Sequence, residues 1–144
     1  MKRIKQISVF LENSPGRMAQ VTSKLADNDV NIRALSVADT SDFGILRMIV
    51  NNPDKAYEKL KEAGFAVSIT EVLAVRMPDI PGALYQFLEV LRSEEVNLEY
   101  MYAFCGVASG SAINVIRIDQ MDKACKILAE KNIDILDGDV VYAL

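Results

Sequence analysis

The sequence contains no histidine, and this absence removes the side chain that most often serves as a catalytic base or a metal ligand. Its aspartates and glutamates are scattered along predicted helices and turns, where single carboxylates are solvated charge. General acid-base and nucleophilic catalysis require such groups to be gathered in one pocket. We therefore predict no metal site, no cofactor and no catalytic residues.

Cysteine is also scarce, because Cys105 and Cys125 are the only two and stand apart without CxxC spacing. Isolated thiols of this kind are typical of reduced, packed cysteines rather than a disulfide framework. No apolar run approaches the ~20 residues that a membrane-spanning helix requires, and no apolar signal segment follows Met1. We expect a soluble, cytoplasmic protein with no membrane partner.

Positive charge is in short supply, since the net charge is -4 and the isoelectric point is about 4.9. The longest cationic cluster is Lys2-Arg3 with Lys5, which is too small for the basic stripe that binds a phosphate backbone. A hydrophobic content of 51% with 25% charged residues is typical of ordered globular proteins. The composition predicts a globular protein that does not bind nucleic acid.

What the chain does contain is an internal repeat. Segments of the first half return in the second half, displaced first by 66 positions and later by 68: Pro15-Gly16 as Pro81-Gly82, Val30-Asn31-Ile32 as Val96-Asn97-Leu98, and Asp54-Lys55-Ala56 as Asp122-Lys123-Ala124. An offset kept through helices, turns and strands indicates a duplicated folding unit. We predict two domains, 1–70 and 71–144, with a loop two residues longer within 103–111 than within 39–44.

Hydrophobic periodicity predicts the same order of elements in both copies: strand, helix, strand, strand, helix, strand. In the first copy the strands are expected at 7–11, 32–38, 45–50 and 67–75, with helices after Pro15 and Pro53. In the second copy strands are expected at 98–104, 112–118 and 140–144. Short antiparallel connections with both helices on one face of the sheet define the ferredoxin-like unit, so the fold class is α+β with two βαββαβ units in tandem.

The last strand of the first copy overlaps the first strand of the second, which leaves no room for a linker. We predict one long strand, or two abutting strands, through this junction, and hence rigidly coupled halves.

Strand alternation also predicts which residues face the helices, since one parity must be apolar in both copies. In the first copy these core residues are Ile7, Val9, Leu11, Leu35, Val37, Met48 and Val50.

A Pro-Gly turn joins the first strand of each copy to its first helix. Amide groups at Gly16, Arg17 and Met18 are expected to be unpaired at this helix start, where the helix dipole favours a ligand carboxylate. Gly16 allows close backbone approach, and asparagine oxygens can accept from an α-amino group. Asn13 and Asn31 each have two interpretations: they bind a ligand, or Asn13 caps the helix and Asn31 fixes the turn into the next strand.

The run Glu12-Asn13-Ser14-Pro15-Gly16, followed by Val30-Asn31-Ile32, resembles the serine-sensing ACT domain of phosphoglycerate dehydrogenases, and the ACT resemblance covers both halves. It implies that the loop after the first strand and the start of the second strand of a neighbouring copy enclose a free amino acid. The residues that it implies are Asn13, Ser14, Pro15, Gly16, Arg17, Met18 and Asn31, and in the second copy Asp79, Ile80, Pro81, Gly82, Ala83, Leu84 and Asn97.

This chain departs from the serine sensors at one position. They have a histidine in the strand just before the loop, where this chain has Leu11 and Met77. Apolar residues there favour an amino acid with a larger, less polar side chain than serine. In the second copy Asp79 replaces Asn13, and a carboxylate pairs better with an ammonium group but repels a ligand carboxylate. The two loops are therefore expected to differ in affinity or specificity.

The resemblance implies a non-catalytic regulatory protein that binds an amino acid between its copies or in a homodimer, and passes the binding state to a metabolic enzyme. The alternative is an interaction module or regulatory subunit that docks on such an enzyme without binding a ligand. Ferredoxin-like acylphosphatases cradle phosphate in a loop with an arginine, and Arg17 lies in such a loop, but no asparagine partner stands on the following strand at matching spacing. Gly16→Val or Gly82→Val is expected to block its loop and leave the fold intact.

Overall fold

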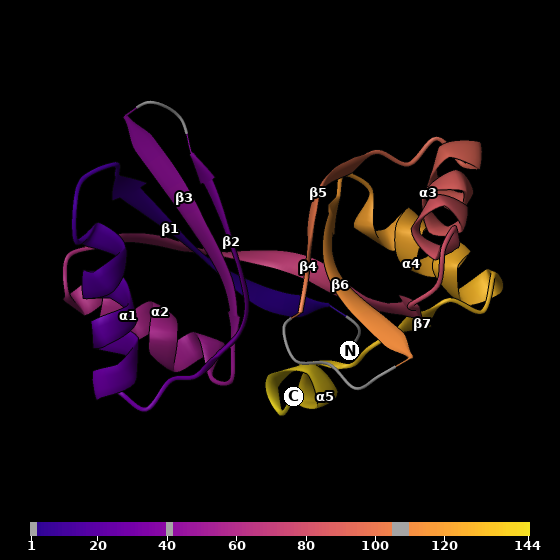
Figure 1. Ribbon diagram of the computed structural model, residues 1–144. Helices are drawn as coiled ribbons and strands as arrows, with labels where there is room; N and C mark the ends of the chain where they lie inside the picture. Colours follow the sequence, from indigo (N-terminus) through magenta and orange to yellow (C-terminus); the bar gives the residue numbers. More distant parts are fainter. Residues whose placement is uncertain (1–2, 40–41, 105–109) are drawn as a thin grey trace. The chain divides into compact units, whose positions relative to one another are not determined.

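A computed structural model describes residues 3–39, 42–104 and 110–144 of the chain. The elements follow in the order β1 (Ile4–Glu12), α1 (Arg17–Asp27), β2 (Ile32–Asp39), β3 (Phe43–Val50), α2 (Pro53–Glu62), β4 (Ala66–Pro78), α3 (Ala83–Ser93), β5 (Leu98–Ala103), β6 (Ser111–Ile118), α4 (Met121–Glu130), β7 (Asp134–Ile135) and α5 (Gly138–Tyr142) (Figure 1). Two compact units are present: the first unit is built from Lys5–Thr70 and the second mainly from Glu71–Tyr142.

The first unit is a βαββαβ arrangement with strand order β2-β3-β1 followed by the first part of β4. Antiparallel pairing sets Ile7 opposite Met48, and Met48 opposite Leu35, so these three side chains share one face. Helices α1 and α2 cover that face, and their apolar stripes bury it. The core of the unit consists of Ile7, Val9, Leu11, Val21, Leu25, Val30, Leu46, Met48, Val50, Ala56 and Leu60.

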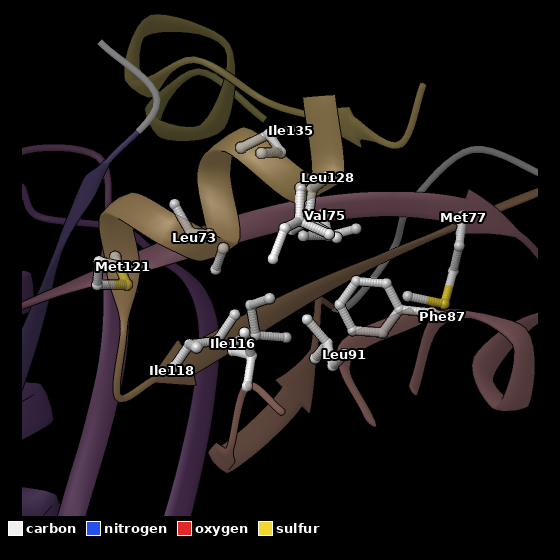
Figure 2. Close-up of a cluster of buried hydrophobic side chains, with 13 residues drawn as sticks. Leu73, Val75, Met77, Phe87, Leu91, Ile116, Ile118, Met121, Leu128 and Ile135 are labelled. Carbon is white, nitrogen blue, oxygen red and sulfur yellow. The ribbon is translucent and has the colours of Figure 1, made fainter. Parts of the chain in front are cut away.

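The second unit repeats this plan with strand order β7-β4-β6-β5. Its core gathers side chains from α3, α4 and the sheet, and Figure 2 shows them converging from these elements. The buried members include Leu73, Val75, Met77, Phe87, Leu91, Ile116, Ile118, Met121, Leu128 and Ile135. The predicted fold class, two ferredoxin-like units with antiparallel sheets, is confirmed.

Strand β4 is a single element of 13 residues that contributes its beginning to the first unit and its remainder to the second. The prediction of one long strand through the junction is therefore confirmed. Residues 72–75 of its second part are all buried, and only the end of the strand alternates, with exposed Arg76 between buried Val75 and Met77.

The predicted last strand at 140–144 is wrong. The structure instead places the short strand β7 at Asp134–Ile135, where it pairs with Val75 and Arg76 of β4. Residues 138–142 form helix α5, whose first turn closes through hydrogen bonds from the amides of Val140 and Val141 to the carbonyl of Asp137. In helical geometry only one side chain of this apolar run points inward: Val141 is fully buried, whereas Val140 is exposed.

Two predicted core residues of β2 are also not buried. Leu35 and Val37 lie on the helix-facing side of the sheet, as their parity required, but they are 45% and 47% exposed. Strand β2 is the edge of the sheet, and the helices pack over β1 and β3, whose residues are buried. Parity therefore predicted the face correctly, while burial depended on the position of the strand in the sheet.

Cys125 is a free thiol, and burial raises its pKa above the ordinary value. Cys105 and the longer loop expected within 103–111 fall largely on residues outside the described part of the chain. No helix within residues 3–39, 42–104 and 110–144 has the length and apolar character needed to cross a bilayer.

Candidate ligand site

Each unit has a tight elbow between its first strand and its first helix, formed around Gly16 and Gly82. Both glycines adopt left-handed conformations, with φ of 84° and 87°. Matching hydrogen bonds hold the two elbows: the amide of Asn13 donates to the carbonyl of Asp42 at 2.9 Å, and the amide of Asp79 donates to that of Gly110 at 3.2 Å. The repeated sequence therefore produces the same backbone at both positions.

The N-cap position of the helix above the first elbow is Gly16, which has no side chain to cap the helix. The Arg17 amide was expected to be unpaired, but it donates a hydrogen bond to the carbonyl of Ser14 at 3.4 Å and closes a turn. The amides of Met18 and Ala19 have no acceptor among the described residues. No acidic side chain lies in this first turn, so the positive end of the helix dipole is uncompensated.

A cavity of about 350 Å³ opens beside this elbow. Its polar side is formed by Glu12, Asn13, Ser14, Gly16 and Arg17, and its apolar side by Leu11, Met18, Val37 and Leu46. Leu11 and Leu46 are buried core residues, whereas Met18 and Val37 are 39% and 47% exposed. The cavity thus places unpaired helix amides next to an apolar floor, and its volume lies at the lower end of those of small-molecule sites.

Arg17 also lines this cavity, but its guanidinium is held by Phe65 and Gln20, which do not line it. Its guanidinium lies 5.1 Å from the centre of the Phe65 ring, a cation–π distance, and its Nη1 donates to Oε1 of Gln20 at 2.6 Å. Its Nε is buried without a hydrogen-bond partner among the described residues. A buried donor without an acceptor is unfavourable, so an anion beside Arg17 would be stabilised.

Asn31 lies at the opposite end of the first unit from the elbow. Helix α1, with 11 residues, separates the two and rises about 16 Å. The backbone of Asn31 is held by Asn51, whose Oδ1 accepts from the Asn31 amide at 2.9 Å and whose amide donates to the Asn31 carbonyl at 3.0 Å. The side chain of Asn31 itself makes no hydrogen bond to a described residue, so the turn is fixed by Asn51 rather than by Asn31.

The second unit repeats this clamp with Asp119, whose carboxylate accepts from the Asn97 amide at 3.1 Å. Sequence reasoning missed both Asn51 and Asp119. The sequence could have indicated both residues, because the two positions are related by the same 68-residue offset as the neighbouring blocks and both carry side-chain oxygens.

The second elbow differs from the first in its surroundings. Ile80 and Leu84 are 63% and 44% exposed there, and Pro81 and Asp79 are exposed as well. A cavity of about 560 Å³ does lie in this unit, but Ala83 is the single expected ligand residue that lines it. It opens on the side of α3 that faces β4 and the turn between α4 and β7. The two elbows thus share a backbone conformation, but among the described residues the cavity beside the first elbow has no equivalent beside the second.

The expected effect of Gly16→Val needs correction. A Cβ atom at Gly16 or Gly82 would meet no heavy atom within 4 Å, so there is space for it. The positive φ is nevertheless a conformation that a β-branched residue almost never adopts. Valine would strain the backbone as well as fill the loop, so the substitution cannot leave the fold unaffected.

Comparison with known proteins decides the family. The family model described as "ACT domain pair" matches residues 2–143. The chain belongs to the ACT domain pair family. This confirms the tandem ACT organisation that the resemblance implied.

Solved structures similar to this chain include protein BT0572 from Bacteroides thetaiotaomicron, at 46% identity and a TM-score of 0.94 over 99% of this chain and 98% of that one. The regulatory subunit of aspartate kinase from Thermus thermophilus, in ligand-free form, has a TM-score of 0.62 and 14% identity, covering 88% of this chain and 90% of that one. The corresponding subunit from Thermus flavus has the same TM-score at 18% identity, with coverages of 87% and 88%. A search of curated protein sequences finds no match.

Proposed function

We propose that this ACT domain pair is a non-catalytic regulatory protein that binds a free amino acid at its first elbow. The observation that carries the proposal is the cavity of about 350 Å³, in which unpaired helix amides lie beside an apolar floor. The ligand carboxylate would rest on the amides of Met18 and Ala19. The ligand side chain would lie against Leu11 and Leu46.

The second asparagine of the motif completes this proposal from another copy. Within one unit, Asn31 is a helix length away from the elbow and cannot touch the same small ligand. Its side chain has no hydrogen-bond partner among the described residues, so it is available to an ammonium group bound at the elbow of another ACT copy. This arrangement requires oligomerisation, and we expect a homodimer in the cytoplasm.

The nature of the floor favours an amino acid with a branched or aromatic side chain over serine. Leu11 occupies the place of the histidine in the serine sensors and offers no hydrogen bond to a hydroxyl group. Burying an unpaired hydroxyl against Leu11 and Leu46 is unfavourable, whereas burying methyl groups is favourable. The fold-level likeness to regulatory subunits of aspartate kinase is compatible with a metabolic enzyme as the regulated partner.

A second candidate function rests on the exposed apolar surface of β2. Leu35 and Val37 project from an edge strand, and such surfaces commonly engage another protein. In that case the protein would be an interaction module or regulatory subunit that docks on a metabolic enzyme without sensing a ligand.

Isothermal titration calorimetry of the full chain against the twenty amino acids separates the two functions. We expect a saturable heat with one or more apolar amino acids, a loss of affinity in Asn31→Ala, and little change in the matched variant Asn97→Ala. Equal losses in both variants would move the ligand away from the first elbow. Silence with all twenty would leave the docking module as the function.

A further inference from the structure

We propose that the second unit contains a separate binding site for a small carboxylate with an apolar body, in the cavity between α3 and the α4–β7 turn. This cavity has a volume of about 560 Å³, which lies within the range of small-molecule sites. It is larger than the cavity at the first elbow and lies on another side of the helix that follows the elbow. The proposal does not depend on amino-acid binding at the first elbow.

The internal repeat shows why this space is open. In the first unit the equivalent positions hold Arg17, Gln20 and Phe65, which contact one another through the cation–π pair and the hydrogen bond between Arg17 and Gln20. In the second unit these positions are Ala83, Gln86 and Ile133. The glutamine is kept, while Arg17 and Phe65 of the first copy are replaced by the smaller Ala83 and Ile133 in the second.

Backbone hydrogen bonds establish that these positions correspond. The amide of Phe65 donates to the carbonyl of Leu60 at 3.1 Å, and the amide of Ile133 donates to that of Leu128 at 2.9 Å. At the helix starts, the Gln20 amide bonds to the Gly16 carbonyl at 3.0 Å, and the Gln86 amide to that of Gly82 at 2.9 Å. The difference between the units is therefore one of side chains.

The same replacement removes the arginine beside an exposed glutamine. Gln20 accepts a hydrogen bond from Arg17, whereas the side chain of Gln86 has no such donor and makes no hydrogen bond to a described residue. Gln86 lines the cavity, together with the hydroxyl-bearing Ser111. Its amide is thus free to donate to a ligand.

Charge selects the ligand class. The charged lining residues of the cavity are Arg76, Lys131 and Asp134, which give a net charge of +1 from two cations and one anion. Asp134 lies 3.8 Å from Nε of Arg76 and compensates it in part, while Lys131 has no carboxylate partner among the described residues. The first unit has Phe10, Ala63 and Ala66 at the equivalent positions, so the charges are particular to the second unit. A positively charged lining favours an anion.

The floor of the cavity is apolar. Met77 and Phe87 are 8% and 4% exposed, belong to the hydrophobic core and lie at one end of it in Figure 2. Val90 and Ile133 add partly buried aliphatic surface. A ligand that places its carboxylate at Lys131 can therefore bury an aliphatic or aromatic body on these side chains.

Methionine methyl NMR on the full chain tests the proposal, because Met77 lines this cavity and Met18 lines the cavity at the first elbow. The probe is 3-phenylpropanoate, which carries no α-amino group, and its matched neutral control is 3-phenylpropanamide. We expect a saturable shift of the Met77 methyl signal with the carboxylate, a much weaker response to the amide, and no shift of Met18. Amino-acid binding at the first elbow would instead shift Met18, so the two proposals fail independently.

Two variant pairs locate the site. Ala83→Arg with Ile133→Phe rebuilds the filling seen in the first unit and should abolish the Met77 shift. Lys131→Gln should weaken binding by up to about fivefold, since Lys131 is exposed, while Lys126→Gln, an equal charge change on α4 outside the cavity, should not. This second pair keeps the test decisive if the filled variant does not fold.

Three results would overturn the proposal. They are the absence of a Met77 shift at the solubility limit of the carboxylate, equal binding of the amide, and binding that persists unchanged in the filled variant. Equal weakening by both lysine substitutions would likewise show that net charge, and not this cavity, attracts the probe.

Discussion

Gly16→Ala tests the backbone on which the first elbow depends. The φ of Gly16 is 84°, and an L-residue in this left-handed region is less stable than glycine by about 1–2 kcal/mol. Steric conflict adds nothing, because a Cβ atom there would meet no heavy atom within 4 Å. A 1 kcal/mol loss lowers the Tm of a chain of this size by about 2–4 °C, so we expect a fall of roughly 2–8 °C.

The matched variant is Gly16→Asn, since asparagine tolerates the left-handed region better than alanine. The chain itself already places Asn132 there, with a φ of 56°. Urea unfolding and thermal melting, followed by circular dichroism, should rank the proteins as wild type, Gly16→Asn and Gly16→Ala in decreasing stability. A neutral Gly16→Ala, or equal losses in the two variants, would refute the argument that the positive φ requires glycine.

Three further predictions concern packing, the strand clamp and the partly buried thiol of Cys125. Met48→Ala should lower the free energy of unfolding by about 2–5 kcal/mol, because Met48 is fully buried. Leu35 is the exposed cross-strand neighbour of Met48, so Leu35→Ala should change the free energy of unfolding by less than about 0.5 kcal/mol. Similar losses of the two variants in urea unfolding would contradict this difference in burial. Asn51→Ala should speed hydrogen exchange of the amide that it clamps, and an unchanged rate would show that the clamp is not formed in solution. Because burial raises the pKa of Cys125, this thiol should react slowly with iodoacetamide at neutral pH in a Cys105→Ser protein. The same protein should lose stability as the pH rises above the unfolded thiol pKa of about 8.5. Rapid labelling of the native protein at pH 7 would contradict the raised pKa.

The repeat made most of the fold predictable. Strand and helix periods recur in both copies, so each pattern was read twice, and the long β4 followed from the overlap of two strand predictions. Residues 140–144 were predicted as a strand but 140–142 form part of a helix, because a short apolar run fits a strand or one turn of a buried helix equally well. The 68-residue offset would have placed the strand correctly, since Val67 corresponds to Ile135.

At the candidate site, too, the sequence predicted some features of the elbows and not others. The pattern Pro-Gly predicted both turns between strand and helix, and the structure shows that their glycines are left-handed. The pattern did not predict that Arg17 would stack on Phe65, since those residues meet only when α1 packs beside the end of α2. The pattern also could not show that the space beside Ala83 in the second unit, which corresponds to the space taken by Arg17 in the first, stays open.

The sequence by itself determined the two ACT units, their order of elements and their glycine elbows, because these depend on local periodicity and backbone conformation repeated along the chain. The tertiary structure decided which apolar residues are buried and where cavities lie. Those properties depend on which strand forms the edge of a sheet and on whether side chains distant in sequence fill the space between them, as at Leu35 on β2 and at Ala83 beside Ile133.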